Sequence, residues 1–222
     1  AGMAMNYRDD DGAVVCYFGD GATSEGDFHE GLNFAGVFET PTVFFCENNN
    51  WAISLPRDRQ TAAASIADRA EAYGFSGGQV DGNDPLAVLE FVGSALESAR
   101  DGEPVLVESM TYRQGAHTTS DDPSRYRDEE SDLPEWRTRD PLDRYEEYLR
   151  DQELINDTYV ETIHEEADEE LADAVDRAEA KEPAEPEEVF DSVYAELPPR
   201  LRKQREEALS FVEEHDVQEL EH

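Results

Sequence analysis

The first half of the chain contains two short continuous hydrophobic runs, at residues 13–18 and 42–46. Apolar runs of this length, each ending in glycine or polar residues, are typical of strands buried on both faces of a parallel sheet. Between them, residues 24–35 carry apolar positions at helical spacing, and Ser24 with Asp27 resembles a capping pair at the helix start. The order strand, turn, helix, strand predicts a βαβ unit. We therefore expect an α/β fold with a parallel sheet flanked by helices.

The alternation of helices and strands continues along the chain. Asp84 followed by Pro85 predicts the start of a further helix, which ends near Gly102. Residues 104–110 form the next predicted strand. A long polar loop over about 112–139 then follows, and a loop of this length in a compact domain is usually functional or disordered.

The composition changes after residue 140. Apolar residues at helical spacing continue there on a heavily acidic background, and Pro198-Pro199 opens a last predicted helix. We therefore expect an α/β domain over residues 1–140 and an acidic helical carboxyl-terminal region over 141–222.

Composition adds an unusual excess of acidic residues. The 222 residues include 55 Asp and Glu against 18 Lys and Arg, which gives a formal net charge of −37 at pH 7. A dispersed acidic surface repels itself at low ionic strength. We therefore expect a halophilic protein from a salt-rich cytoplasm, with an ordinary acidic mesophilic protein as the alternative. Binding to nucleic acid is disfavoured, because the chain offers no basic face to phosphates.

The two cysteines and the lack of a long apolar run indicate in which cell compartment the protein is expected. Cys16 and Cys46 lie inside the strand-like runs, so we expect two buried small hydrophobic residues rather than a disulfide. No apolar run approaches transmembrane length, and no signal peptide is visible. A cytoplasmic enzyme without a membrane partner is the expected class. The chain does not begin with methionine, so we expect it to be a fragment.

Two polar motifs follow the first two predicted strands. Gly19-Asp20-Gly21 comes after the first strand and Asn48-Asn49 after the second, and the carboxyl ends of neighbouring parallel strands lie side by side. A carboxylate, an amide oxygen and a backbone carbonyl are suitable ligands for Mg²⁺, and Gly21 permits close approach to a phosphate. The pair predicts a magnesium–diphosphate site. The alternative is two independent polar turns that cap the sheet.

Longer motifs around these residues resemble one known family. They are CYFGDGATSEGD at 16–27, FFCENNNWAIS at 44–54, VDGND at 80–84 and MTYRQGAHTTSDD at 110–122. They are similar to the alpha subunit of the thiamine-diphosphate-dependent decarboxylating component of 2-oxoacid dehydrogenase complexes. The resemblance covers nearly the whole chain and implies a thiamine-diphosphate-binding fold whose amino-terminal part is missing here. The segment Leu201-Arg202-Lys203-Gln204-Arg205 is similar to branched-chain rather than pyruvate members.

The resemblance implies roles for individual residues. The implied ligands of Mg²⁺ are Asp20, Asn49 and the main-chain carbonyl of Trp51. The implied contacts of thiamine diphosphate are Gly19, Asp20, Gly21, Ala22, Asn49, Arg113 and His117. A guanidinium suits a phosphate oxygen, and a histidine that titrates near neutral pH suits the catalytic role implied for His117 in acyl transfer. Asp121 would help to order the cofactor loop.

Four positions depart from the family pattern. Glu47 stands where some branched-chain members carry an arginine that contacts the phosphate, and Ala116 stands where they carry a second histidine. Thr118 replaces the serine that is phosphorylated in animal homologues, so control by a kinase is not implied. Trp51 replaces the usual tyrosine, which matters little where only the carbonyl binds metal.

The resemblance implies an oxidoreductase that catalyses oxidative decarboxylation of a 2-oxoacid, either branched-chain or pyruvate, with acyl transfer to lipoamide. The implied partners are a beta subunit, in an alpha2-beta2 heterotetramer, and a lipoyl-bearing acyltransferase. A glutamate of the beta subunit would activate the cofactor, so this chain would carry half of the site. Two alternatives are another thiamine-diphosphate enzyme, transketolase-like or a non-lipoyl decarboxylase, and a non-catalytic nucleotide-binding α/β domain. The loop 113–122 argues against the first alternative.

Overall fold

The computed structural model describes residues 1–8, 11–127, 139–182 and 184–215. The chain divides into two compact units, residues 1–155 and 156–222. Helix α6 (Pro141–Asp151) therefore belongs to the first unit. The predicted domain boundary after residue 140 stays a prediction, and the part of the predicted loop at 128–138 lies outside the described residues.

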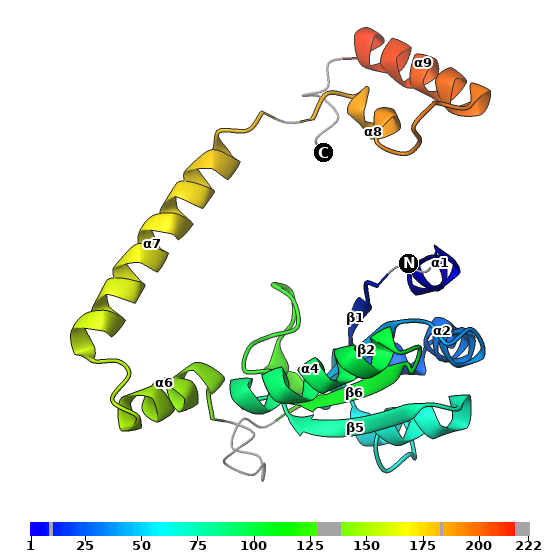
Figure 1. Ribbon diagram of the computed structural model, residues 1–222. Helices are drawn as coiled ribbons and strands as arrows, with labels where there is room; N and C mark the ends of the chain where they lie inside the picture. Colours follow the sequence, from blue (N-terminus) through cyan, green and yellow to red (C-terminus); the bar gives the residue numbers. More distant parts are fainter. Residues whose placement is uncertain (9–10, 128–138, 183, 216–222) are drawn as a thin grey trace. The chain divides into compact units, whose positions relative to one another are not determined.

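The first unit is built on a parallel four-stranded sheet in the order β1-β2-β6-β5 (Figure 1). The strands are β1 (Val14–Gly19), β2 (Thr42–Asn48), β5 (Ser76–Asp81) and β6 (Val105–Met110). The three predicted strands are confirmed. Strand β5 went unpredicted because its sequence, SGGQVD, has no apolar run. It forms because its backbone pairs with β6 at the edge of the sheet.

Helices cover both faces of this sheet. The helices of the first unit, besides α6, are α1 (Gly2–Arg8), α2 (Gly26–Val37), α3 (Arg57–Gln60), α4 (Pro85–Arg100) and the 3₁₀ helices η1 (Asp20–Ser24), η2 (Ala67–Tyr73) and η3 (Pro123–Arg125). Helix α4 packs on one face, and α2 with η2 packs on the other. The predicted α/β architecture, a parallel sheet flanked by helices, is therefore confirmed.

The core follows from the alternation of side chains along the two central strands. Val43, Phe45, Val105 and Val107 meet Ala95 and Ala99 of α4. The intervening positions, Cys46 and Leu106, meet Leu32 of α2 together with Ile66 and Ala70. Successive residues of a strand point to opposite faces, so a strand covered on both sides must be apolar at nearly every position. Each fully buried Val or Leu stabilises the fold by roughly 1.5–3 kcal/mol relative to exposure.

Helix α4 begins as predicted. Asp84 Oδ1 accepts hydrogen bonds from Leu86 N and Ala87 N, each at 3.1 Å, and Pro85 occupies the first turn. The side chain of Arg144, in α6, then binds Asp81 at 2.6 Å and Asp84 at 2.9 Å. These two ion pairs connect α6 to the last residue of β5 and to the N-cap of α4.

The start of α2 differs from its prediction. A 3₁₀ turn occupies residues 20–24, and α2 begins at Gly26 with Glu25 as its N-cap and no side-chain cap bond. The predicted capping pair is therefore wrong. The hydroxyl of Ser24 instead lies 3.4 Å from Gln60 Oε1, because the 3₁₀ turn directs it toward α3.

The two cysteines also differ from each other. Cys46 is buried in the central strand β2, as predicted, but Cys16 is exposed. Strand β1 is an edge strand of the four-stranded sheet, so its apolar run is only partly covered in this chain. Both thiols are free.

The second unit is helical, as predicted for the carboxyl-terminal region. It contains α7 (Asp157–Glu179), α8 (Glu188–Asp191) and α9 (Pro199–Glu214), and α9 opens at the predicted prolines. Within the described ranges, no helix has both the length and the apolar character needed to cross a membrane.

Candidate functional site

Three loops that carry predicted site residues leave the same edge of the sheet. Strands β1, β2 and β6 run parallel and end at Gly19, Asn48 and Met110. The register pairs Asn48 with Met110, and Thr111 N donates to Asn48 O at 3.0 Å. Parallel strands commonly place ligand sites at this carboxyl edge.

Asp20 is the most buried of the predicted site residues, with 1% of its surface exposed. Its Oδ2 accepts a long hydrogen bond of 3.5 Å from Gln60 Nε2. Its Oδ1 is buried and has no hydrogen-bond partner among the described residues. Burial raises the pKa of this carboxyl, and its own backbone amide and then Gln60 oppose that rise only in part. A buried carboxylate oxygen without a partner is costly unless a cation satisfies it.

Asn49 and Trp51 form a tight turn against Asp20. The amide of Trp51 donates to Asn49 Oδ1 at 3.1 Å, which leaves this oxygen one further acceptor position. Asn50 between them has a positive φ of 70°, a conformation that asparagine tolerates better than most residues. The backbone of Asn49 and Trp51 is close enough to Asp20 to lower the pKa of its carboxyl slightly. The residues predicted to bind the metal are therefore neighbours in the structure.

Asn48 has a different role from its neighbour Asn49. It is buried, its Nδ2 donates to Glu108 Oε1 at 2.6 Å, and its Oδ1 accepts from Asn50 N at 3.0 Å. Its side chain is thus occupied inside the protein, whereas Asn49 is half-buried and its side chain accepts a hydrogen bond from the Trp51 amide.

Close packing leaves no room for a side chain at Gly21, in the first loop. A Cβ on Gly21 would lie 2.8 Å from Ala52 Cβ and 3.2 Å from Ala52 Cα. Ala52 belongs to a small antiparallel hairpin, β3 (Trp51–Ala52) with β4 (Leu55–Pro56), which the sequence did not predict. Gly19 has open space around it, and Ala22 contributes its carbonyl to a bond from Glu25 N at 3.1 Å. The first loop and the hairpin are therefore in contact.

Arg113 lies against the same hairpin. Its Nη2 donates to Ile53 O at 2.9 Å and to the Tyr126 hydroxyl at 2.7 Å. Its Nε and Nη1 are buried and have no partner among the described residues. An anchored guanidinium with unused donors is suited to an anionic oxygen.

The loop after β6 is held by a second set of contacts. Asp121 Oδ2 accepts from His117 N at 2.9 Å and from the Tyr126 hydroxyl at 2.7 Å. The amide of His117, and then the hydroxyl of Tyr126, hold the pKa of the Asp121 carboxyl below its ordinary value. The ring of Tyr126 packs on Trp51, with centroids 5.3 Å apart. Asp121 thus orders this loop next to the hairpin.

Arg127 binds the backbone of the same loop. Its Nη1 donates to Arg113 O at 2.6 Å, and its Nη2 donates to the carbonyls of Gln114 and Gly115 at 3.3 and 3.2 Å. The guanidinium also stacks over Tyr112 at 5.2 Å. Arg127 therefore shapes the backbone that carries Arg113.

His117 is exposed at the surface of this loop. Its backbone is bound to Asp121, but among the described residues its imidazole makes no hydrogen bond to Asp20, Asn49 or Arg113. The structure thus brings Asp20, Asn49, Trp51 and Arg113 around one hairpin. Among the described residues, hydrogen bonds link His117 to Arg113 through Asp121 and Tyr126.

Sequence reasoning missed four residues of this region: Gln60, Glu108, Tyr126 and Arg127. Glu108 carried a signal, because a carboxylate in the run Val-Leu-Val-Glu-Ser-Met must find partners when the strand is buried. The other three lie far in sequence from the residues they bind, or in a polar loop without periodicity. Nothing in their local pattern distinguishes them from surface residues.

The donor set limits which metal fits. In the part of the chain that the structure describes, no group of three or more His, Cys, Asp or Glu side chains is placed to hold a metal. One carboxylate, one amide oxygen and a backbone carbonyl are hard oxygen donors, and Mg²⁺ typically takes one or two carboxylates with phosphate oxygens and water. The residues around Asp20 fit such an ion together with a phosphate ligand.

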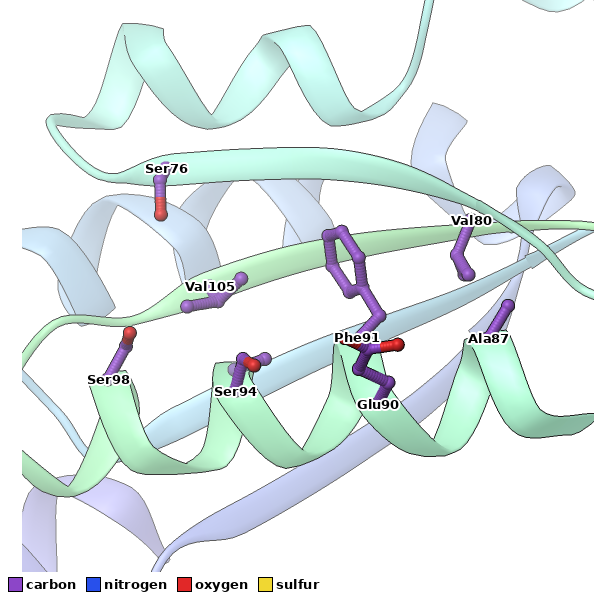
Figure 2. Close-up of a pocket in the computed structure, with 9 residues that line it drawn as sticks. Ser76, Val80, Ala87, Glu90, Phe91, Ser94, Ser98 and Val105 are labelled. Carbon is purple, nitrogen blue, oxygen red and sulfur yellow. The ribbon is translucent and has the colours of Figure 1, made fainter.

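A cavity of about 510 Å³ lies away from this site, between α4 and the strands β5 and β6. Figure 2 shows Phe91 of α4 projecting toward the strands, with Ser76 of β5 and Val105 of β6 further along the pocket, toward Ser98. Its lining is apolar with serine hydroxyls, and Glu90 is its one charged residue. No predicted site residue lines it, so this cavity is separate from the loops at the carboxyl edge of the sheet.

Comparison with known proteins gives several similar chains. The 3-methyl-2-oxobutanoate dehydrogenase subunit alpha of Mycobacterium tuberculosis is 50% identical over 211 residues, covering 93% of this chain and 56% of the relative. The 2-oxoisovalerate dehydrogenase subunit alpha of Bacillus subtilis is 44% identical over 194 residues, covering 87% and 58%. The pyruvate dehydrogenase E1 component subunit alpha of Staphylococcus epidermidis is 41% identical over 210 residues, covering 93% and 56%.

This chain thus spans a little over half the length of these relatives. A family model described as "Dehydrogenase E1 component" matches residues 1–187. That match takes in the sheet, the loops at its carboxyl edge and helix α6. The chain therefore belongs to the dehydrogenase E1 component family, which confirms the resemblance of its motifs.

Proposed function

We propose that this chain is part of the alpha subunit of a thiamine-diphosphate-dependent 2-oxoacid dehydrogenase. The reaction is oxidative decarboxylation of a 2-oxoacid, with transfer of the acyl group to lipoamide. The observation that carries the proposal is the buried Oδ1 of Asp20, which has no partner among the described residues and lies beside the Asn49–Trp51 turn. Family membership supports it, since relatives are named as dehydrogenases of 3-methyl-2-oxobutanoate and pyruvate.

In this proposal the metal is Mg²⁺, held by Asp20, Asn49 and the carbonyl of Trp51. The cation offsets the cost of burying the Asp20 charge, and it takes its remaining ligands from diphosphate oxygens and water. The backbone at Gly19, Gly21 and Ala22 faces the diphosphate, and Gly21 is the position where the hairpin leaves no room for a side chain. Arg113 offers the donors Nε and Nη1 to a phosphate oxygen.

Thiamine diphosphate, when bound, supplies the carbanion that attacks the keto carbon and the ring that accepts electrons as CO₂ leaves. The protein residues then bind, orient and move protons around it. His117 is exposed on the loop and its imidazole is free to meet a substrate or a lipoyl group. We assign it the proton transfer that accompanies acyl transfer.

The chain requires partners for this activity. A beta subunit, in an alpha2-beta2 heterotetramer, completes the cofactor site, and a lipoyl-bearing acyltransferase accepts the acyl group. The cytoplasm is the proposed location. The substrate is a branched-chain 2-oxoacid or pyruvate, and relatives of both kinds match this chain.

The test uses the full-length alpha subunit assembled with its beta subunit. Thiamine diphosphate is titrated by calorimetry with and without Mg²⁺, and decarboxylation of a panel of 2-oxoacids is followed with and without a lipoyl domain. Mg²⁺-dependent binding that is lost in Asp20→Ala, together with lipoyl acylation, supports the proposal. Decarboxylation without lipoyl acylation would indicate another thiamine-diphosphate enzyme. No Mg²⁺-dependent binding would reject the main proposal and favour a nucleotide-binding domain.

A further inference from the structure

The side chain of Glu108 is a buried carboxylate at the centre of the sheet. It lies in β6 and has 0% of its surface exposed. Its partners are four nitrogen donors: Asn48 Nδ2 at 2.6 Å, Ile66 N at 2.9 Å, Ala67 N at 3.0 Å and Gln79 Nε2 at 3.0 Å. The first bond is to Oε1 and the other three are to Oε2. Both oxygens therefore act as acceptors in these four bonds.

One of these bonds leads to Asn49. Glu108 Oε1 holds the amide nitrogen of Asn48 and thereby turns Asn48 Oδ1 toward the amide of Asn50, which it accepts at 3.0 Å. That bond fixes the turn in which Asn49 sits. Because an amide has one oxygen and one nitrogen, the orientation of Asn48 depends on which group Glu108 presents to it.

Two other bonds lead to Asp20. Glu108 Oε2 accepts the amides at the start of η2, from Ile66 and Ala67. Helix η2 carries Arg69, whose Nη1 donates to Thr23 O at 2.8 Å. Thr23 in turn donates its hydroxyl to Asp20 O at 2.7 Å. The same carboxylate thus supports both loops from which the proposed Mg²⁺ ligands come.

We propose that Glu108 is a positioning residue that sets Asp20 and Asn49 at the spacing required to share one Mg²⁺ ion. This inference rests on the proposed function. Glu108 does not touch the ion or the cofactor; it acts through Asn48 and η2. A carboxylate at this place is costly to bury, and the four donors satisfy it while connecting two loops.

The bond pattern predicts what an exchange of groups will do. In Glu108→Gln, the amide oxygen must take the position of Oε2, because three donors meet there. The new NH₂ then takes the position of Oε1 and faces Asn48. Asn48 must then turn its Oδ1 toward that NH₂, and its own nitrogen meets the amide of Asn50, donor against donor. Adding Asn48→Asp removes this clash, because a carboxylate at position 48 has two acceptor oxygens. One accepts from the NH₂ of the glutamine and the other accepts from Asn50 N.

The experiment compares four forms of the full-length alpha subunit assembled with its beta subunit: wild type, Glu108→Gln, Asn48→Asp/Glu108→Gln, and Gln79→Ala. Mg²⁺ is titrated at saturating thiamine diphosphate, and binding is followed by calorimetry. We expect Glu108→Gln to weaken Mg²⁺ binding by about 10–100-fold, as loss of a residue that orients a metal ligand does. The double variant should recover to within about threefold of wild type if the exchange restores the bonds. Gln79→Ala removes a bond that leads to neither loop and should stay within about twofold.

An Mg²⁺ affinity of Glu108→Gln within about twofold of wild type would overturn the inference, and so would a double variant no tighter than the single one. If Glu108→Gln does not assemble, the double variant decides: assembly with near-wild-type affinity supports the inference. Failure of both to assemble overturns it, because Glu108 would then serve the fold as a whole. A wild type that binds no Mg²⁺ with thiamine diphosphate would reject the proposed function instead.

Discussion

The hydroxyl of Tyr126 accepts a hydrogen bond of 2.7 Å from Arg113 Nη2. It donates its own proton to Asp121 Oδ2, also at 2.7 Å. Asp121, Tyr126 and Arg113 thereby form one chain of hydrogen bonds, at the point where the loop after β6 meets the hairpin. This chain of hydrogen bonds holds Arg113 Nη2 and leaves Nε and Nη1 for a ligand.

Tyr126→Phe should weaken binding of thiamine diphosphate in the presence of Mg²⁺. The change removes the hydroxyl that links Asp121 to Arg113 and keeps the ring that packs on Trp51. A net hydrogen bond contributes about 0.5–1.5 kcal/mol, so we expect a loss of roughly 2–12-fold in affinity, measured by calorimetry. Tyr112→Phe is the matched control, because it keeps the ring beneath Arg127. Equal losses in the two variants would contradict the prediction.

Asp20→Asn should abolish Mg²⁺-dependent cofactor binding and yet stabilise the cofactor-free protein near neutral pH. Burial raises the pKa of Asp20 above its ordinary value of 3.8, so the folded state disfavours the charge. As pH rises past 3.8, the unfolded chain loses this proton before the folded chain does, and Asp20 lowers the free energy of unfolding. The variant removes that cost. Thermal unfolding of the cofactor-free assembly at pH 7, wild type against variant, measures it; a less stable variant would contradict it.

The same shift sets the pH dependence of metal binding. Mg²⁺ binds the ionised carboxylate, so the apparent affinity should fall as pH is lowered through the raised pKa of Asp20. The decline should begin at a higher pH than for an ordinary aspartate. Calorimetric titrations of Mg²⁺ across pH 4–8, in about unit steps, follow the change. An affinity that stays constant down to pH 4 would contradict it.

Gly21→Ala should destabilise the first loop. The added Cβ would lie 2.8 Å from Ala52 Cβ, so the hairpin must move, at a cost of about 1–3 kcal/mol. Gly31→Ala is the contrast: Gly31 lies within α2 with open space around it, and alanine there should stabilise by about 0.5–1 kcal/mol. Denaturant unfolding of the two variants compares them. A Gly21→Ala protein as stable as wild type would show that the hairpin is not packed against this loop.

His117→Ala should leave assembly and cofactor binding unchanged and slow acyl transfer. The imidazole makes no hydrogen bond to Asp20, Asn49 or Arg113 among the described residues, so the proposed Mg²⁺ site should not depend on it. Loss of a proton-transfer group typically costs about 10²–10⁴-fold in rate. Single-turnover acylation of a lipoyl domain measures the effect. Equal rates in wild type and variant would remove His117 from the mechanism.

The acidic surface should make stability depend on salt. A net charge of −37 repels itself, and ions screen that repulsion over about 10 Å at 0.1 M and about 3 Å at 1 M. We expect Tm to rise steadily from low salt to molar KCl, as measured by circular dichroism. A Tm that does not change with KCl would favour an ordinary acidic mesophilic protein.

Much of the framework could be predicted from the sequence, because its signals are local. Continuous apolar runs marked β1, β2 and β6, and Asp84 with Pro85 marked the start of α4. Alternating strands and helices imply a parallel sheet, and a parallel sheet places Asp20 and Asn49 at one edge. Strand β5 was missed because Ser-Gly-Gly has no hydrophobic signal and forms a strand only by pairing with β6.

The sequence by itself therefore determined the fold class, the family and the edge of the sheet where we propose the site, since apolar patterning and contiguous motifs carry that information. The resemblance had singled out Asn49 from the identical residue before it, but only the tertiary structure showed what each side chain contacts. Asn48 is buried against Glu108, whereas Asn49 is half-buried and accepts a hydrogen bond from Trp51 N. Burial of Asp20 and the bonds of Arg113 were likewise decided by contacts between distant segments. Such contacts leave no periodic trace in the chain, because they depend on where the folded backbone brings each side chain.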